Sequence, residues 1–316
     1  MSWNRKFTTL FVGAIATTIF IIQPLVSVAF DGRELSDTTR EITVLVNSSS
    51  GNNGSGVIIS KDNDVYYVLT ANHVTSVREN KEGKIDYQVV TSDKQAYNID
   101  YETIQPLPNN LDLAIFTFVS DKDYPVATIS SVPLVETTPV FVSGWQRPGS
   151  VGGEETIRQL TSSRITTVLK EPYEGGYQIG YDNTTLGGMS GGPVVDVEGR
   201  VVGIHGLADS DKPETVDLDS SNASGKTLGE LLKTGFNYGI PIDTFLGQAG
   251  QAGIYLNLQV ENSAPEELDE DPVIATDPEK DRIDNLNVVL DDVDRSLDTV
   301  ERGTDALDRG REILGF

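Results

Sequence analysis

Short β-type runs separated by turn residues follow one another from Ile42 to about Ile242, and they fall into two sets of about six. Short runs of β-branched and aromatic residues bounded by Gly, Asn, Asp or Ser are typical of antiparallel strands. The first set comprises Ile42–Val46, Gly54–Ser60, Val65–Thr70, Ile85–Thr91, Ala96–Ile99 and Leu113–Val119. The second comprises Val140–Gly144, Gln159–Val168, Gly176–Tyr181, Pro193–Asp196, Arg200–His205 and Phe236–Ile240, followed by a short helix from Ile242 to about Leu246. This pattern predicts an all-β fold of two antiparallel six-stranded barrels with a cleft between them.

A glycine-rich segment, Leu186–Pro193, contains a single serine, Ser190. Glycine tolerates backbone angles that a Cβ forbids, so the amides of such a segment can point into one small volume. Glycine and serine are also common in ordinary turns. If Ser190 is a nucleophile, the N–H groups of Gly188 and Ser190 are the candidates to receive the oxyanion of a tetrahedral intermediate.

A serine hydroxyl needs a neighbouring base to act as a nucleophile, and the sequence contains only two histidines, His73 and His205. His73 follows the apolar run Val68–Leu69, at a predicted strand end. Asp112 precedes an apolar run that is typical of a buried strand, where a lone carboxylate must find a hydrogen-bonding or charged partner.

The order of these three residues resembles that of the trypsin-like (chymotrypsin-fold) serine peptidases. The matching segments are TANHV at 70–74, LDLAI at 111–115, VSGW at 142–145 and GGMSGGP at 187–193. The resemblance covers roughly residues 38 to 247. It implies that His73 is the general base and acid, that Asp112 orients it, that Ser190 is the nucleophile, and that Gly188 and Ser190 supply the oxyanion hole.

The sequence contains no cysteine, so no disulfide supports the fold. Val74 stands where animal members of this family usually carry a cysteine beside the histidine. The resemblance therefore favours a bacterial branch.

Around the serine, the sequence resembles the bacterial glutamyl endopeptidases in Tyr181–Thr185 and Gly203–Gly206. The resemblance implies that Thr185 and His205 contact the carboxylate of the substrate residue before the scissile bond. The broader resemblance to the trypsin-like family places Thr184, six residues before Ser190, at the bottom of that pocket, so the acid that selects lysine or arginine is absent. A hydroxyl and an imidazolium N–H both suit a carboxylate. We therefore expect cleavage after Glu or Asp. The alternative is that His205 simply packs on the barrel as a strand-end histidine.

The first 29 residues have the layout of a secretory signal peptide: Arg5 and Lys6, an apolar stretch, and small residues up to Ala29. We expect cleavage after Ala29, which places the protein in the periplasm or outside the cell. The alternative is an uncleaved membrane anchor, because the apolar stretch approaches the length that spans a bilayer. Gln23 and Pro24 interrupt that stretch and favour cleavage.

The formal net charge of −24 argues against nucleic acid as a partner, because phosphate binding needs clustered Lys and Arg. Residues 207–234 form a long acidic, serine-rich insertion. Its aspartates could gather calcium, but their spacing lacks the glycine and final glutamate of an EF-hand loop. A solvated loop is the default interpretation, and we expect neither a metal nor another cofactor.

Beyond the second strand set the composition changes. Residues 261–279 contain three prolines and are typical of an extended acidic linker. Apolar residues then recur at three- and four-residue steps between positions 283 and 314, which predicts a charged helix with a heptad seam. The seam could mediate self-association, bind a partner helix, or dock on the barrels; we favour the first two.

These observations divide the chain into a signal peptide (1–29), a peptidase domain (30–250), an acidic linker (251–280) and a coiled-coil-like helix (281–316). They predict an exported serine endopeptidase that cleaves proteins or peptides through an acyl-enzyme. The alternative is a peptidase-like binding module with a vestigial cleft, acting through its acidic tail.

Overall fold

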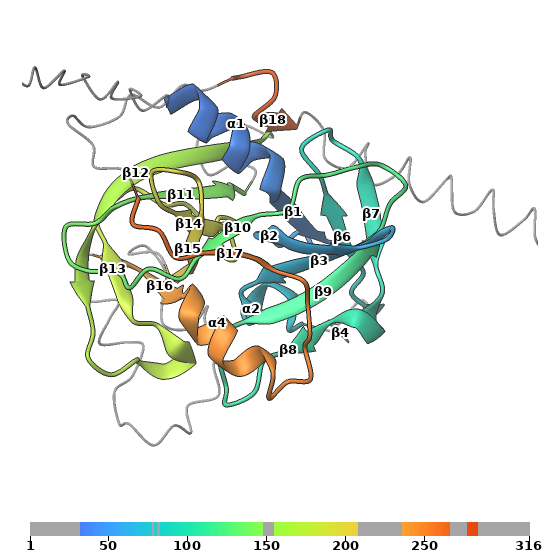
Figure 1. Ribbon diagram of the computed structural model, residues 1–316. Helices are drawn as coiled ribbons and strands as arrows, with labels where there is room; N and C mark the ends of the chain where they lie inside the picture. Colours follow the sequence, from blue (N-terminus) through green and yellow to red (C-terminus); the bar gives the residue numbers. More distant parts are fainter. Residues whose placement is uncertain are drawn as a thin grey trace, which may run out of the picture.

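The computed structural model describes residues 32–77, 79–80, 83–147, 155–207, 236–265 and 277–283 of the chain. The predicted signal peptide, nearly all of the acidic insertion and the heptad positions after Ile283 lie outside these ranges. Two β units lie beside each other, as Figure 1 shows. The described helices are short, and none has the length and hydropathy needed to cross a bilayer.

The first unit is a curled sheet of seven strands in the order β7-β6-β1-β2-β3-β9-β8. Its strands are β1 (Thr43–Ser48), β2 (Asn53–Asp62), β3 (Val65–Thr70), β6 (Tyr87–Val90), β7 (Ala96–Ile99), β8 (Gln105–Pro106) and β9 (Ala114–Val119). A small ribbon of β4 (Glu79–Asn80) and β5 (Gly83–Lys84) stands apart from the sheet. Tyr66 stacks on Phe118 in its apolar interior. Among the described residues this sheet ends in β7 and the two-residue β8, so it is a curled half-barrel, which is consistent with the expected double-barrel fold.

The second unit is a closed barrel of six strands, in the order β14-β11-β12-β13-β16-β15, with β15 pairing back to β14. These strands are β11 (Pro139–Trp145), β12 (Thr156–Val168), β13 (Ile179–Tyr181), β14 (Pro193–Val195), β15 (Val201–Leu207) and β16 (Asn237–Pro241). Two further strands, β10 (Thr128–Ser130) and β17 (Gln259–Glu261), add to the edge at β15 in parallel pairs. The predicted all-β class and six-stranded second barrel are thus confirmed.

Two longer helices pack on this β framework. Helix α4 (Ile242–Ala249) buries Ile242 and Phe245 in the main apolar core and confirms the short helix expected after the last strand. Helix α1 (Gly32–Ile42) buries Leu35 in the same core. The sequence pattern did not predict α1, because its buried face also carries serine, threonine and arginine.

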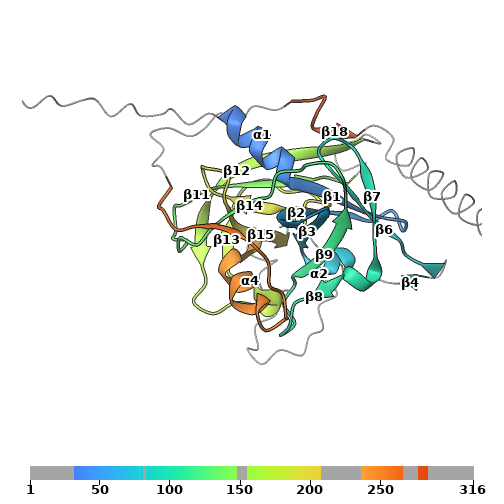
Figure 2. The same cartoon turned by 45° about the vertical axis from the view of Figure 1, so that its right-hand side comes forward.

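The segment 277–283 returns to the first residues of the fold. Strand β18 (Arg282–Ile283) pairs with β12, and Ile283 is buried against Leu45, Val90 and Trp145. In both views α1 and β18 lie side by side (Figures 1 and 2). Part of the expected linker is therefore strand β17, and the first residues of the expected helix form β18. Ile283, expected in a heptad seam, instead packs in the peptidase domain.

Candidate active site

His73 and Asp112 are brought together by adjacent strands. His73 lies in the short helix α2 (Asn72–Thr75) that follows β3, and Asp112 lies just before β9, which pairs with β3 in antiparallel register. The Nδ1 atom of His73 is 2.7 Å from Oδ2 of Asp112, and the His73 backbone N–H donates to Oδ1 at 2.8 Å. Asp112 is fully buried and His73 is partly exposed. This geometry fixes the imidazole and leaves its other nitrogen as the candidate base.

A third hydrogen bond to Asp112 comes from a residue that the sequence did not indicate. The hydroxyl of Tyr177 donates to Oδ2 of Asp112, although Tyr177 belongs to the second unit. The Asp112 backbone N–H donates to the carbonyl of Gly175 at 2.9 Å. A tyrosine in an irregular loop has no motif spacing, so no sequence signal pointed to it.

Ser190 lies at the contact between the two units. Its carbonyl accepts the backbone N–H of Ser55 at 2.8 Å. The next residue, Gly191, has φ +86°, and a Cβ there would stand 2.1 Å from the Ser55 carbonyl and 3.0 Å from the amide nitrogen of Ala71. Only glycine allows this approach. Ser190 is thereby held close to the β3–α2 turn that carries His73, while its hydroxyl donates to the carbonyl of Gly206 at 3.2 Å.

The backbone around Ser190 is shaped so that two amides are left unused. Gly188 has φ +101°, its carbonyl accepts the hydroxyl of Ser55 at 2.9 Å, and the Gly187 carbonyl accepts the Arg147 N–H at 2.6 Å. Within the described residues, no hydrogen bond uses the N–H of Gly188 or of Ser190. Unpaired amides beside a candidate nucleophile are what an oxyanion requires.

The candidate specificity residues divide into buried and exposed members. Thr185 is buried, and its hydroxyl donates to Oδ1 of Asn237 at 2.8 Å. His205 is fully buried, with Nδ1 2.8 Å from the Tyr181 hydroxyl. Tyr181 and Asn237 are cross-strand partners, so the two pairs are neighbours. Thr184 is exposed, which corrects the expectation that it forms the bottom of a pocket.

The protonation of His205 follows from its surroundings. Burial, and then the nearby His73, lower the pKa of His205 to about 3, so the side chain is neutral in the free protein rather than the expected imidazolium. Burial raises the pKa of Tyr181 well above its usual value, so its hydroxyl keeps its proton. In the bond between this hydroxyl and Nδ1 of His205 either atom can be the donor, and the choice decides whether the imidazole hydrogen lies on Nδ1 or on Nε2. Nε2 is buried and has no hydrogen-bond partner in the described part of the chain.

The depressed pKa of His205 predicts acid sensitivity. The unfolded chain takes up a proton near pH 6.5 that the folded state refuses until about pH 3, so stability falls as the pH drops through this window. The slope from this group is about 1.4 kcal/mol per pH unit. Chemical denaturation between pH 6.5 and 5 should show the decline in the wild type, and His205→Gln should show a flatter curve. Parallel curves for the two proteins would contradict this assignment.

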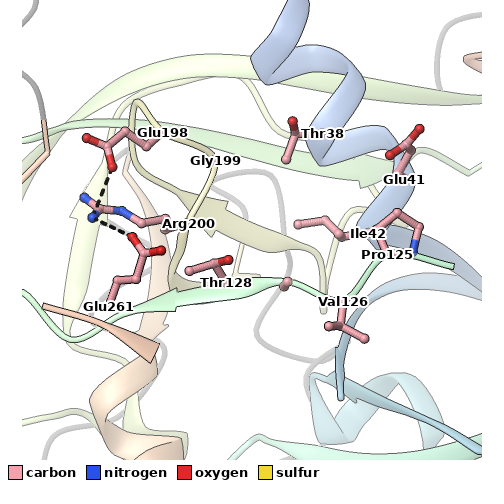
Figure 3. Close-up of a pocket in the computed structure, with 11 residues that line it drawn as sticks. Thr38, Glu41, Ile42, Pro125, Val126, Thr128, Glu198, Gly199, Arg200 and Glu261 are labelled. Atoms are coloured by element: carbon pink, nitrogen blue, oxygen red, sulfur yellow. Dashed lines mark hydrogen bonds and ion pairs between the residues drawn. The ribbon is translucent and has the colours of Figure 1, made fainter. Parts of the chain in front are cut away.

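A separate cavity of about 300 Å³ lies between α1, residues 125–128 and the turn at Glu198–Arg200. Figure 3 shows Arg200 paired there with Glu198 and Glu261. None of the candidate catalytic residues lines it, so it is not the active site. No cluster of metal-ligand type occurs within the described ranges. The aspartates of the acidic insertion lie outside those ranges.

Part of the chain is similar to known proteins. Residues 54–204 match the family described as trypsin-like peptidase domain. A glutamyl endopeptidase of Staphylococcus epidermidis is 27% identical over 164 residues, which are 48% of this chain and 53% of the relative. A probable periplasmic serine endoprotease, DegP-like, of Brucella suis biovar 1 is 30% identical over 189 residues, 58% of this chain and 33% of the relative. The chain thus spans about half the length of the first relative and a third of the second.

Among solved structures, the crystal structure of Rv3671c protease in its inactive form aligns with a TM-score of 0.48 at 17% identity. The alignment covers 69% of this chain and 92% of that one.

Proposed function

The chain carries a trypsin-like serine peptidase domain at residues 54–204, and we propose on this basis that it is an exported endopeptidase working through Ser190, His73 and Asp112. Ser190 attacks the carbonyl carbon of the scissile bond while His73 takes the hydroxyl proton. His73 then gives that proton to the leaving amine, which produces an acyl-enzyme. A water molecule then attacks the ester while His73 takes its proton, and His73 returns that proton to the Ser190 oxygen as the acid product leaves. The amides of Gly188 and Ser190 hold the oxyanion.

The observation that carries this proposal is the bond between His73 and Asp112 at the contact between the units. Asp112 accepts from both the ring and the backbone of His73, at 2.7 and 2.8 Å, which fixes the tautomer and the ring orientation. Ser190 is anchored on the opposite side of the same contact by Ser55. In the free protein the Ser190 hydroxyl is directed to Gly206, so the reaction requires it to rotate toward His73. Apo active sites often show such loose arrangements.

The proposed substrate preference is Glu or Asp before the scissile bond. It is supported by the unpartnered Nε2 of His205 and by Thr185, whose hydroxyl would turn from Asn237 to donate to the substrate carboxylate. In the tautomer that carries the imidazole hydrogen on Nε2, this atom is a buried donor without a partner in the described part of the chain, and a substrate carboxylate would satisfy it. An approaching carboxylate also favours a second proton on His205, which would make the bond charge-assisted. The relative in Staphylococcus epidermidis, named a glutamyl endopeptidase, supports the same preference.

Thr185→Val tests this preference, because valine keeps the shape of the side chain and removes the hydroxyl. With peptides that differ only in Glu or Gln before the scissile bond, the wild type should favour Glu in kcat/KM. In the variant, the ratio of kcat/KM for the Glu peptide to kcat/KM for the Gln peptide should fall by about tenfold to hundredfold. This is the effect of losing one hydrogen bond to a charged group. Thr117→Val, at a half-buried threonine of β9, is the matched control and should leave the ratio unchanged. If the wild type prefers Leu or Phe before the scissile bond, or cleaves the Glu and Gln peptides equally well, the proposed preference for acidic residues is wrong.

We further propose that the protein is exported, with cleavage after Ala29. The layout of residues 1–29 supports this, and the Brucella relative is itself named periplasmic. N-terminal sequencing of the mature protein should begin at Phe30. A chain that retains Met1 would instead support the anchor alternative.

A further inference from the structure

Tyr177 crosses from the second unit to a residue of the first. It is fully buried, and its hydroxyl donates to Oδ2 of Asp112, the same oxygen that faces Nδ1 of His73. The Asp112 carboxylate therefore accepts three hydrogen bonds, from the ring and the backbone N–H of His73 and from the Tyr177 hydroxyl. Burying a carboxylate is costly unless hydrogen-bond donors replace the lost water, and these three donors do so for Asp112.

The loop that carries Tyr177 also holds the backbone of Asp112. A 3-10 turn, η2 (Glu174–Gly176), precedes the tyrosine, and the Tyr173 N–H donates to the Tyr177 carbonyl at 2.9 Å. Within this turn, the Gly175 carbonyl accepts the Asp112 N–H at 2.9 Å. One loop thus fixes Asp112 through both its backbone and its carboxylate.

Gly206 provides the space that the tyrosine occupies. A Cβ at position 206 would stand 2.2 Å from the hydroxyl oxygen of Tyr177 and 2.7 Å from Cε1 of the same ring. Both distances are shorter than van der Waals contact allows. The carbonyl of the same Gly206 accepts the Ser190 hydroxyl at 3.2 Å. Tyr177 and Gly206 therefore connect the surroundings of Asp112 with those of Ser190.

We propose that Tyr177 is a positioning residue for peptide hydrolysis: its hydroxyl holds the Asp112 carboxylate turned toward His73, and only glycine at position 206 leaves room for the tyrosine. The inference rests on the proposed function. Tyr177 does not touch the substrate. It acts through Asp112, so its removal changes the basicity of the His73–Asp112 pair and leaves substrate binding intact.

Tyr177→Phe removes only the hydroxyl. We expect kcat to fall about tenfold to hundredfold, as for loss of one hydrogen bond to a charged group, with KM within about twofold of the wild type. The acid limb of kcat/KM should move to higher pH, because a carboxylate with one donor fewer makes the coupled pair more basic. A merely structural role would not move this limb.

Tyr66→Phe is the matched control, since Tyr66 is also fully buried and its hydroxyl donates to the Lys122 carbonyl at 2.7 Å in the first unit. It should leave the acid limb in place. If Tyr177→Phe fails to fold, Gly206→Ala displaces the hydroxyl from the other side and should produce the same upward shift. An active wild type whose acid limb is unmoved in the folded variant, or moved equally by Tyr66→Phe, would overturn this inference and leave the proposed function standing. A wild type that neither cleaves peptides nor reacts at Ser190 would overturn both.

Discussion

Replacing Ser190 by alanine is expected to lower kcat for peptide hydrolysis by a factor on the order of 10⁴ to 10⁶, with little change in KM. In the proposed mechanism the Ser190 hydroxyl supplies the atom that forms the acyl-enzyme, and alanine removes that atom. Initial rates with a peptide containing Glu before the scissile bond measure this effect.

The three proposed catalytic residues should act as one unit. His73→Ala should therefore cost nearly as much as Ser190→Ala, and the double variant should be no slower than the worse single variant. Circular dichroism should show that all three variants are folded, because none of these substitutions disturbs the barrel cores. A Ser190→Ala protein with more than about a tenth of the wild-type kcat would contradict the assignment of the nucleophile.

Asp281→Asn is expected to destabilise the protein by about 3 to 5 kcal/mol, which corresponds to a fall in Tm of roughly 6 to 20 °C. Oδ1 of Asp281 accepts from Nε of Arg40 and from Nε of Arg158, each at 2.7 Å, and all three side chains are at most 5% exposed. Burial would raise the pKa of Asp281, but the hydrogen bonds from Arg40 and Arg158 hold it below its ordinary value. Asparagine would leave Arg158 without its ion-pair partner and Arg40 with only the half-exposed Asp37.

Differential scanning calorimetry measures this effect. Asp123→Asn is the matched control: it breaks a 2.6 Å pair with Lys61, but Asp123 is 92% exposed, so the loss should stay within about 1 kcal/mol. Truncation after residue 265 removes Asp281 and Ile283 and should destabilise the domain at least as much as Asp281→Asn. Equal Tm values for Asp281→Asn and Asp123→Asn would show that segment 277–283 contributes nothing to the fold.

The strands and the order of the candidate catalytic residues could be predicted from sequence because both are local patterns. The bounds of β3 and β7 were predicted without error, since each is a short β-type run between turn residues. The His73 and Asp112 segments are recognisable because each residue follows or precedes a buried strand. The contact between His73 and Asp112 was implied by the resemblance to the trypsin-like family. The antiparallel register of β3 with β9 explains why the two residues meet.

The features that sequence reasoning missed depend on contacts between distant residues. Asp281 and Arg40 are 241 positions apart, and no periodicity relates them. Ile283 fits a heptad pattern by spacing alone, yet pairing with β12 makes it part of a strand. Thr184 and Thr185 are adjacent in sequence, but only the second is turned inward. The neutral state of His205 follows from full burial, which a strand-end position did not indicate.

The convergence of Ser190 with His73 is tested most directly by locating the adduct of a fluorophosphonate probe by mass spectrometry. The wild type should carry the probe on Ser190. His73→Ala should react far more slowly, and Ser190→Ala should show no adduct at all. A folded wild type that stays unlabelled, or that carries the probe on a different residue, would contradict the proposed catalytic centre.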